Sequence, residues 1–223
     1  MVEIVPAILA KSREEFLKYT ALVAPHVERV QWDIMDGKFV ENTTFSDPTV
    51  LDELSSRLET VNSKLEIEAD LMVSDPRGWV ERLRHPGVTQ LIFHVESIEN
   101  QPDWKEIFLH ARALGFRVGI ASEPETPFRA LAPLLPLVDR YQAMGGRSGF
   151  GGQEFNPAVL ETVRTVRQEF PRLPISIDIG VNSATASEMV EAGATILCAG
   201  SAVFKSDNVG EAVLALKRAA ENG

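Results

Sequence analysis

Short apolar runs rich in β-branched residues recur along the chain, and stretches with helical periodicity separate them. Runs of about four to eight such residues are typical of buried strands, whereas apolar positions spaced three and four apart are typical of amphipathic helices. The pattern predicts strands at residues 3–8, 27–32, 65–70, 88–94, 116–121, 137–143, 174–179 and 194–199.

Capping residues mark the starts of the intervening helices. A Ser, Thr, Asp or Asn there accepts a hydrogen bond from the first turn, and a following Pro has no N–H to leave unpaired. These signals stand at Ser12, Asp47-Pro48, Asp75-Pro76, Thr126-Pro127, Asn156-Pro157, Asn182 and Asp207. Apolar strands that each precede a helix predict a parallel α/β sheet, here closed into a (β/α)8 TIM barrel; a doubly wound open sheet is the alternative.

The composition fits a single domain over residues 1–223, because one α/β barrel has this length and no linker divides the chain. The net charge of −10 argues against a nucleic-acid surface. No run is long and apolar enough for a membrane span, and the first six residues lack the basic segment and long apolar stretch of a signal peptide, so we expect a soluble protein. The single Cys198 lies in an apolar run, which predicts a buried core thiol in a reducing, cytoplasmic compartment.

A glycine-rich segment follows the predicted sixth strand. Residues 144–153 contain five glycines, and such a loop lets backbone N–H groups approach an anion closely. Gly180 follows the seventh strand and Gly200-Ser201 the eighth, where TIM barrels often bind phosphate. We therefore expect a phosphate site here. Arg147 either adds a charge to that site or is a solvated loop residue.

Two aspartates close apolar runs on opposite sides of the expected barrel mouth: Asp33 after the second strand and Asp178 at the end of the seventh. They are either helix-capping groups or an acid and a base. With a phosphate site nearby, proton removal beside a ketone and its return on the opposite face become the favoured chemistry. Met35, Met72 and Met144 are expected either to form an apolar, water-excluding cap or to pack the barrel.

At these residues the sequence resembles the ribulose-phosphate 3-epimerase family over essentially its whole length. The matching segments are Pro6-Ala7-Ile8-Leu9, Asp33-Ile34-Met35-Asp36-Gly37-Lys38-Phe39-Val40, Leu71-Met72-Val73, His94-Val95-Glu96, Gly149-Phe150-Gly151-Gly152-Gln153-Glu154-Phe155, Asp178-Ile179-Gly180-Val181-Asn182 and Ala199-Gly200-Ser201-Ala202-Val203-Phe204. Any one of them is weak evidence, but together they are specific.

The resemblance implies a homo-oligomeric pentose phosphate pathway enzyme that interconverts D-ribulose and D-xylulose 5-phosphates through a metal-stabilised enediolate. Asp33 and Asp178 match its two acid/base residues. The matching substrate- and phosphate-binding positions are Ala7, Met35, Met72, Met144, Gly149, Phe150, Gly151, Gly152, Gly180, Gly200 and Ser201.

The chain departs from the family pattern at several of these positions. Gln31 and Asp70 stand where the family has two metal-binding histidines. Ala7 replaces a substrate-contacting serine, Arg147-Ser148 replaces Asn-Pro, and Asp178-Ile179-Gly180 replaces Asp-Gly-Gly. His94 is either a replacement ligand or, as its family position favours, a hydrogen-bonded structural residue.

A site of Gln31, Asp33, Asp70 and Asp178 offers only oxygen ligands if the amide oxygen faces inward. Such a set favours magnesium, manganese or calcium over zinc or iron. The alternative is a metal-free site in which a protonated Asp70 is the electrophile.

We expect an epimerase acting at C3 of a ketose phosphate, either the pentulose or a hexulose such as allulose 6-phosphate. The alternatives are another sugar-phosphate isomerase or lyase on the same barrel, and a non-catalytic sugar-phosphate binder. Decarboxylation is not expected, because the segment from Asp33 to Gly37 has no lysine.

Overall fold

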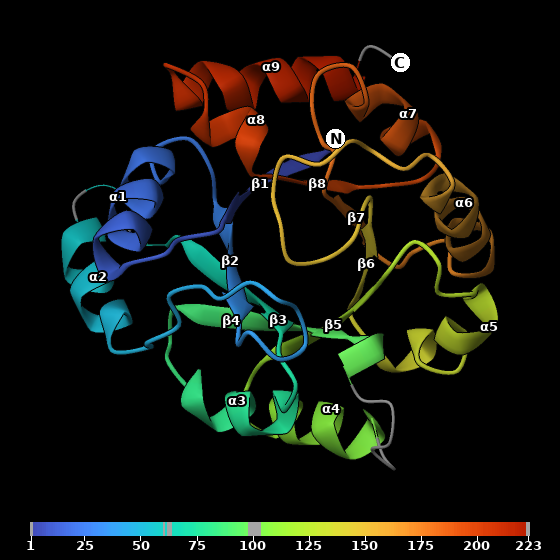
Figure 1. Cartoon of the computed structure of the whole chain (residues 1–223), viewed down its shortest axis with the longest axis horizontal. Helices are drawn as coiled ribbons and strands as arrows, with labels where there is room; N and C mark the ends of the chain where they lie inside the picture. Colours follow the sequence, from blue (N-terminus) through green and yellow to red (C-terminus); the bar gives the residue numbers. More distant parts are fainter. Residues whose placement is uncertain (1, 60, 62–63, 98–103, 222–223) are drawn as a thin grey trace.

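The computed structural model describes residues 2–59, 61, 64–97 and 104–221. In it, parallel strands form one closed barrel in the order β1 to β8 (Figure 1). The strands are β1 (Glu3–Ile8), β2 (Arg29–Met35), β3 (Glu66–Met72), β4 (Val88–His94), β5 (Arg117–Ser122), β6 (Arg140–Met144), β7 (Ile175–Asp178) and β8 (Ile196–Ala199). The prediction of a (β/α)8 TIM barrel is confirmed.

Helices follow the strands and surround the barrel (Figure 1). They are α1 (Arg13–Val23), α2 (Val50–Leu58), α3 (Pro76–Arg82), α4 (Trp104–Ala113), α5 (Phe128–Leu131), α6 (Val159–Glu169), α7 (Ala186–Glu191), α8 (Ser201–Phe204) and α9 (Val209–Glu221). Short 3₁₀ turns occupy Val95–Ser97 and Leu135–Leu137. None of the described helices has the length and apolar character needed to cross a bilayer.

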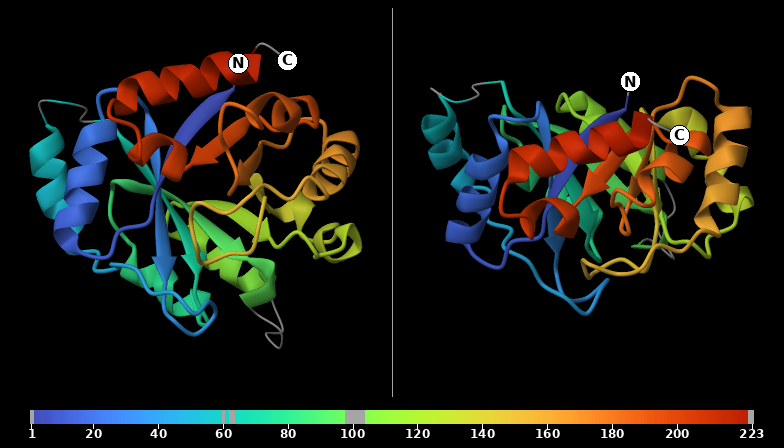
Figure 2. Two further views of the ribbon diagram at one scale, coloured as in Figure 1. Left: turned by 45° about the horizontal axis from the view of Figure 1, so that its top comes forward. Right: turned by 90° about the horizontal axis from the view of Figure 1, so that it is seen from above.

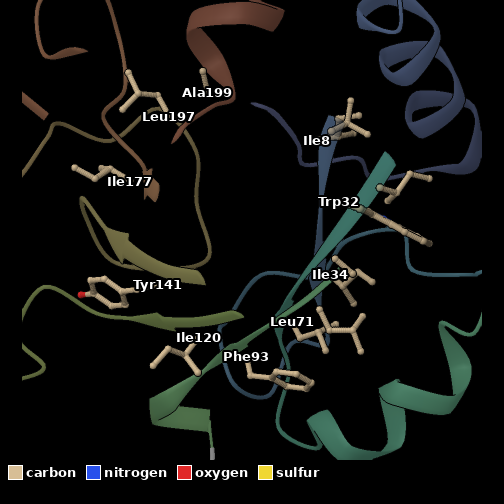
Figure 3. Packing of buried hydrophobic residues seen from close by; sticks show 14 of the residues in the cluster. Ile8, Trp32, Ile34, Leu71, Phe93, Ile120, Tyr141, Ile177, Leu197 and Ala199 are labelled. Carbon is tan, nitrogen blue, oxygen red and sulfur yellow. The ribbon is translucent and has the colours of Figure 1, made fainter. Parts of the chain in front are cut away.

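Alternation along the strands separates the core from the site. In β2, Trp32 and Ile34 belong to the large apolar cluster under the helices (Figure 3). There the Trp32 ring packs 4.6 Å from the Phe16 ring, centroid to centroid. Because successive side chains point to opposite faces, Gln31 and Asp33 instead face the barrel interior. The same alternation in β3 turns Leu71 toward the helices and Asp70 inward.

Two strands, β2 and β3, extend two or three residues beyond their predicted ends, and β5 and β6 extend one residue beyond theirs. The prediction ended the second strand at residue 32 and the third at residue 70, but β2 and β3 remain paired as far as Met35 and Met72. Asp33 therefore lies within β2 rather than in the turn after it. The inward carboxylates interrupt the apolar runs without interrupting the backbone ladder, because Ile34 and Leu71 continue the core on the outer face.

The capping signals are confirmed at Ser12, whose Oγ accepts from Glu15 N at 3.2 Å, and at Asp75, which precedes Pro76 in α3. The other five differ. The residues that directly precede α2, α5, α6 and α7 are Thr49, Pro127, Ala158 and Thr185, so Asp47, Thr126, Asn156 and Asn182 are not the caps. Asn208 rather than Asp207 accepts a hydrogen bond from the first turn of α9. Viewed from above, the long loops after β2 and β6 project from the same end of the barrel (Figure 2).

Candidate active site

Three buried aspartates converge where β2, β3 and β7 end. One carboxylate oxygen from each of Asp33, Asp70 and Asp178 lies within 4.8 Å of the others. The β2–β3 register places Asp33 directly beside Asp70, and closure of the barrel brings Asp178 to them from β7. Asp33 and Asp178 are each 7% exposed and line a cavity at the mouth, whereas Asp70 is fully buried beneath it.

Gln31 bridges the two acids predicted to be catalytic. Its Nε2 donates to Asp33 Oδ1 at 2.9 Å and to Asp178 Oδ2 at 2.7 Å. Its Oε1 is buried and has no hydrogen-bond partner among the described residues. The amide nitrogen, not the oxygen, therefore faces the carboxylates, and ligation of a cation by Gln31 requires the amide to turn over.

Asp70 is held from below by two donors. His94 Nε2 lies 3.0 Å from Asp70 Oδ1, and Gln142 Nε2 donates to Oδ2 at 3.2 Å. Burial alone lowers the pKa of His94, but the Asp70 carboxylate outweighs it and raises that pKa above its ordinary value. His94 is thus a hydrogen-bonded residue beneath the site, as its position in the family pattern led us to expect.

Burial and mutual repulsion raise the pKa values of both mouth aspartates. The pKa of Asp33 rises well above its ordinary value, first through burial and then through the charges of Asp178 and Asp70. Burial, followed by the charge of Asp70, raises the pKa of Asp178 to about 6. Near neutral pH the cluster therefore favours either a shared proton or a bound cation.

The three carboxylates fit a divalent cation. Their oxygens are close enough to share one ion, and hard oxygen donors without an imidazole are the set that magnesium, manganese or calcium prefers. His94 does not belong to this group of ligand atoms, and its Nε2 and Nδ1 contact Asp70 and Ser148 instead.

Nearly all of the sequence-predicted site residues meet at one cavity of about 350 Å³. Those that line it are Ala7, Asp33, Met35, Met72, Met144, Gly149, Phe150, Gly151, Gly152, Asp178, Gly180, Gly200 and Ser201. Gln31 and Asp70 do not line it. Arg147 is exposed and does not line it either, which agrees with a solvated loop residue. Cys198 is buried, as predicted, and also reaches the cavity wall.

Sequence reasoning missed several cavity residues, namely Leu9, Tyr19, Ile179, Val181, Phe204 and Lys205. Leu9, Ile179, Val181 and Phe204 lie inside the recognised motifs and could have been included. Tyr19 comes from the middle of α1, and Lys205 follows α8, so neither carries a local pattern that points to the site.

The glycine-rich loop is tied to its neighbours. Gly149 has φ 111°, and a Cβ there would lie 3.0 Å from Val40 Cβ, so glycine is required on both grounds. Asn42 Nδ2 donates to Gly149 O at 2.7 Å, and the Lys11 ammonium contacts Asn42 Oδ1 and Thr43 O. These contacts connect the loops after β1, β2 and β6 at the cavity mouth.

Ile179 has the left-handed backbone conformation that isoleucine rarely adopts, with φ 72°. Its N–H donates to the Oδ1 of the preceding residue, Asp178, at 2.7 Å, and Gly145 N donates to Asp178 O at 2.6 Å. The strained turn therefore directs a backbone donor onto the Asp178 carboxylate.

The sequence matches the model of the Ribulose-phosphate 3 epimerase family over residues 3–204. The chain belongs to this family. It is 35% identical over 192 residues to the cytoplasmic isoform of ribulose-phosphate 3-epimerase from Oryza sativa subsp. japonica, covering 85% of this chain and 81% of that protein. It is 33% identical over 221 residues to the ribulose-phosphate 3-epimerase of Mycobacterium leprae, covering 97% and 94%. Family membership makes it a carbohydrate epimerase, a class of isomerases.

Solved structures with low sequence identity share the fold of this epimerase-family chain. KGPDC from Streptococcus mutans superposes with a TM-score of 0.73 at 11% identity, covering 99% of this chain and 98% of that one. A 3-hexulose-6-phosphate synthase gives 0.70 at 17% identity, with 97% and 99% covered. At such identities the likeness extends to the barrel alone.

Proposed function

We propose that this family member inverts C3 of a phosphorylated ketose, with D-ribulose 5-phosphate and D-xylulose 5-phosphate as the first pair to test. The observation that carries the proposal is the pair Asp33 and Asp178, which line one cavity from β2 and β7 and share the Gln31 amide. Curated ribulose-phosphate 3-epimerases at 33–35% identity support the choice of substrate.

The reaction needs one ionised and one protonated acid at the same time. The carboxylate takes the C3 proton, and the electrons of the broken C–H bond move into the enediolate as the C2 carbonyl oxygen gains charge. The second acid then gives its proton to the opposite face of C3. Buried carboxyls with raised pKa values suit this division, because one of them readily holds a proton near neutral pH.

Asp33, Asp70 and Asp178 would hold one divalent cation, with magnesium or manganese favoured over zinc or iron by the oxygen-only donor set. Such an ion would offset the negative charge that develops on the enediolate oxygens. Asp70, with both oxygens already hydrogen-bonded, is assigned to charge compensation rather than proton transfer.

The remaining lining residues divide the cavity between sugar and phosphate. Met35, Met72 and Met144 supply an apolar, adaptable wall beside the acids, which suits a planar intermediate that is protonated from either side. The loop from Gly149 to Gly152, with Gly180, Gly200 and Ser201, is assigned to the phosphate. A cavity of about 350 Å³ is within the usual range for small-molecule sites.

Assembly into a homo-oligomer stays a prediction.

Proton NMR in D₂O tests the proposal. With manganese or magnesium supplied, D-ribulose 5-phosphate should give D-xylulose 5-phosphate that carries deuterium at C3. A parallel assay with allulose 6-phosphate tests whether a hexulose phosphate is the substrate instead. A constitutionally different product would indicate another isomerase or a lyase. Absence of both conversion and exchange with every ketose phosphate, whichever metal is supplied, would overturn the proposal.

A further inference from the structure

Lys205 brings a side-chain cation to the wall of the active-site cavity. It follows α8 directly and lines the same cavity as Asp33 and Asp178. Its Nζ lies 3.7 Å from the position that a Cβ on Gly152 would occupy. Gly152 belongs to the glycine-rich loop assigned to phosphate, so the ammonium stands at the phosphate end of the site.

The Lys205 backbone is fixed while its ammonium stays available. The N–H of Lys205 donates to Ser201 O at 3.1 Å, which anchors the residue to the end of α8, and the neighbouring Phe204 ring packs 4.8 Å from Tyr19. No hydrogen bond or ion pair engages Lys205 Nζ within the described part of the chain. The Lys11 ammonium, in contrast, is already committed to the loop contacts at Asn42 and Thr43.

Arg147 provides the comparison. Both cations belong to loops at the cavity end of the barrel, and both are exposed. Lys205 lines the cavity, however, and Arg147 does not. Only one of the two is therefore placed to act on a bound anion.

A dianionic ligand needs such a charge in this protein. The chain carries a net charge of −10, and the cavity itself contains two aspartates. Backbone N–H groups of glycines orient a phosphate but carry no net charge, whereas an ammonium supplies a full charge and three donors. A neutral sugar would gain little from it.

We propose that Lys205 binds the phosphate group of the substrate and thereby selects phosphorylated ketoses over neutral ones. The proposal rests on the proposed function only in taking the substrate to be a sugar phosphate. A charge-assisted contact of this kind predicts a loss of about ten- to a hundredfold in affinity when the ammonium is removed.

Calorimetric titration with inorganic phosphate tests this without requiring turnover. Lys205→Gln should weaken phosphate binding at least about tenfold, and Lys205→Arg should keep it within about threefold of the wild type. Arg147→Gln is the matched control, because it removes the same charge from the same end of the barrel, and it should leave binding unchanged. Both side chains are exposed, so the variants should fold normally.

Each outcome decides the matter. Three results would overturn the role of Lys205. Lys205→Gln could bind phosphate as tightly as the wild type does, Arg147→Gln could lose as much affinity as Lys205→Gln, or the wild type could bind no phosphate. A selective loss in Lys205→Gln supports it even if epimerisation is never detected, which separates this proposal from the proposed function. With an active enzyme, Lys205→Gln should raise KM for the phosphorylated ketose about tenfold or more, with kcat little changed.

Discussion

The amide nitrogen of Gln31 lies 2.7 Å from Asp178 Oδ2 and so connects β2 to β7 across the barrel interior. The same nitrogen donates to Asp33 Oδ1, so one amide holds both of the carboxylates proposed to transfer protons in the same small space. Gln31 therefore acts as a connector between the two acids, in a position where the family resemblance implies a metal-binding histidine.

The crowded carboxylates predict an unusual pH dependence of stability in chelator-treated protein. The pKa of Asp178 is raised from 3.8 to about 6, so the folded state binds its proton more tightly than the unfolded state. The resulting stabilisation is complete below the unfolded pKa and is lost as the pH rises through 6, with a size on the order of 3 kcal/mol.

Urea unfolding between pH 4 and 8 measures this effect as the difference in unfolding free energy between wild type and Asp178→Asn. The subtraction removes the contributions of carboxylates with lowered pKa values, such as Asp36, whose stabilisation is lost toward acid pH. A difference that is independent of pH would contradict the raised pKa. Saturating manganese should reduce the loss above pH 6, because a bound cation compensates the charges.

The oxygen-only donor set predicts a preference among metals. Wild-type protein should bind manganese and magnesium, and the double variant Gln31→His/Asp70→His should gain at least about tenfold in zinc affinity, because imidazole suits zinc better than amide or carboxylate does. Competition with a chromophoric chelator measures the metal affinities of the wild type and of the double variant. Unchanged zinc affinity in the double variant would show that donor type does not set the preference.

The left-handed backbone of Ile179 predicts that two truncated variants will rank in stability opposite to the usual order. Ile179→Gly and Ile179→Ala remove similar packing, but only glycine adopts φ 72° without steric cost. The glycine variant should therefore be the more stable by about 1 kcal/mol, opposite to the usual order of the two residues. Thermal or urea unfolding of the two variants measures the difference in stability. A more stable alanine variant would mean that this turn is unstrained.

A buried ion pair beneath the site predicts strong coupling between two strands. The Arg140 guanidinium, 2% exposed, bonds the fully buried Glu68 carboxylate, and it also donates to Gln142 Oε1, the amide that holds Asp70. Arg140→Met should cost about 3 to 5 kcal/mol because it leaves the buried Glu68 carboxylate with only the longer, 3.5 Å contact to Arg29, whereas Arg140→Met/Glu68→Met should recover most of that loss. Additive losses in a double-mutant cycle would contradict this coupling.

Periodicity was sufficient to predict the barrel, whereas the glycine-rich segment, the polar residues at the strand ends and the family resemblance predicted most of the cavity residues. The ends of β1 and β4 are as predicted, and Asp178 ends β7. The error at Asp33 has a simple cause: an inward carboxylate resembles the end of an apolar run when only the sequence is read. Hydrogen-bonded pairing up to Met35 is a property of the neighbouring strand, which a local pattern does not contain.

Contacts between distant residues could not be predicted from the sequence. The amide orientation of Gln31 depends on Asp178, 147 positions away, and the role of His94 depends on Asp70 in the adjacent strand. Lys205 was overlooked for the same reason, because its place beside Gly152 results from closure of the barrel.

The central claim, that Asp33 and Asp178 act on opposite faces of C3, is tested most directly by deuterium exchange in single-acid variants. In D₂O, Asp33→Asn and Asp178→Asn should each lose epimerisation by at least about a hundredfold. Each should still exchange the C3 proton of one epimer, and the two variants should act on opposite epimers. If both variants exchange the same epimer, or either one still epimerises at the wild-type rate, the two-aspartate account is wrong.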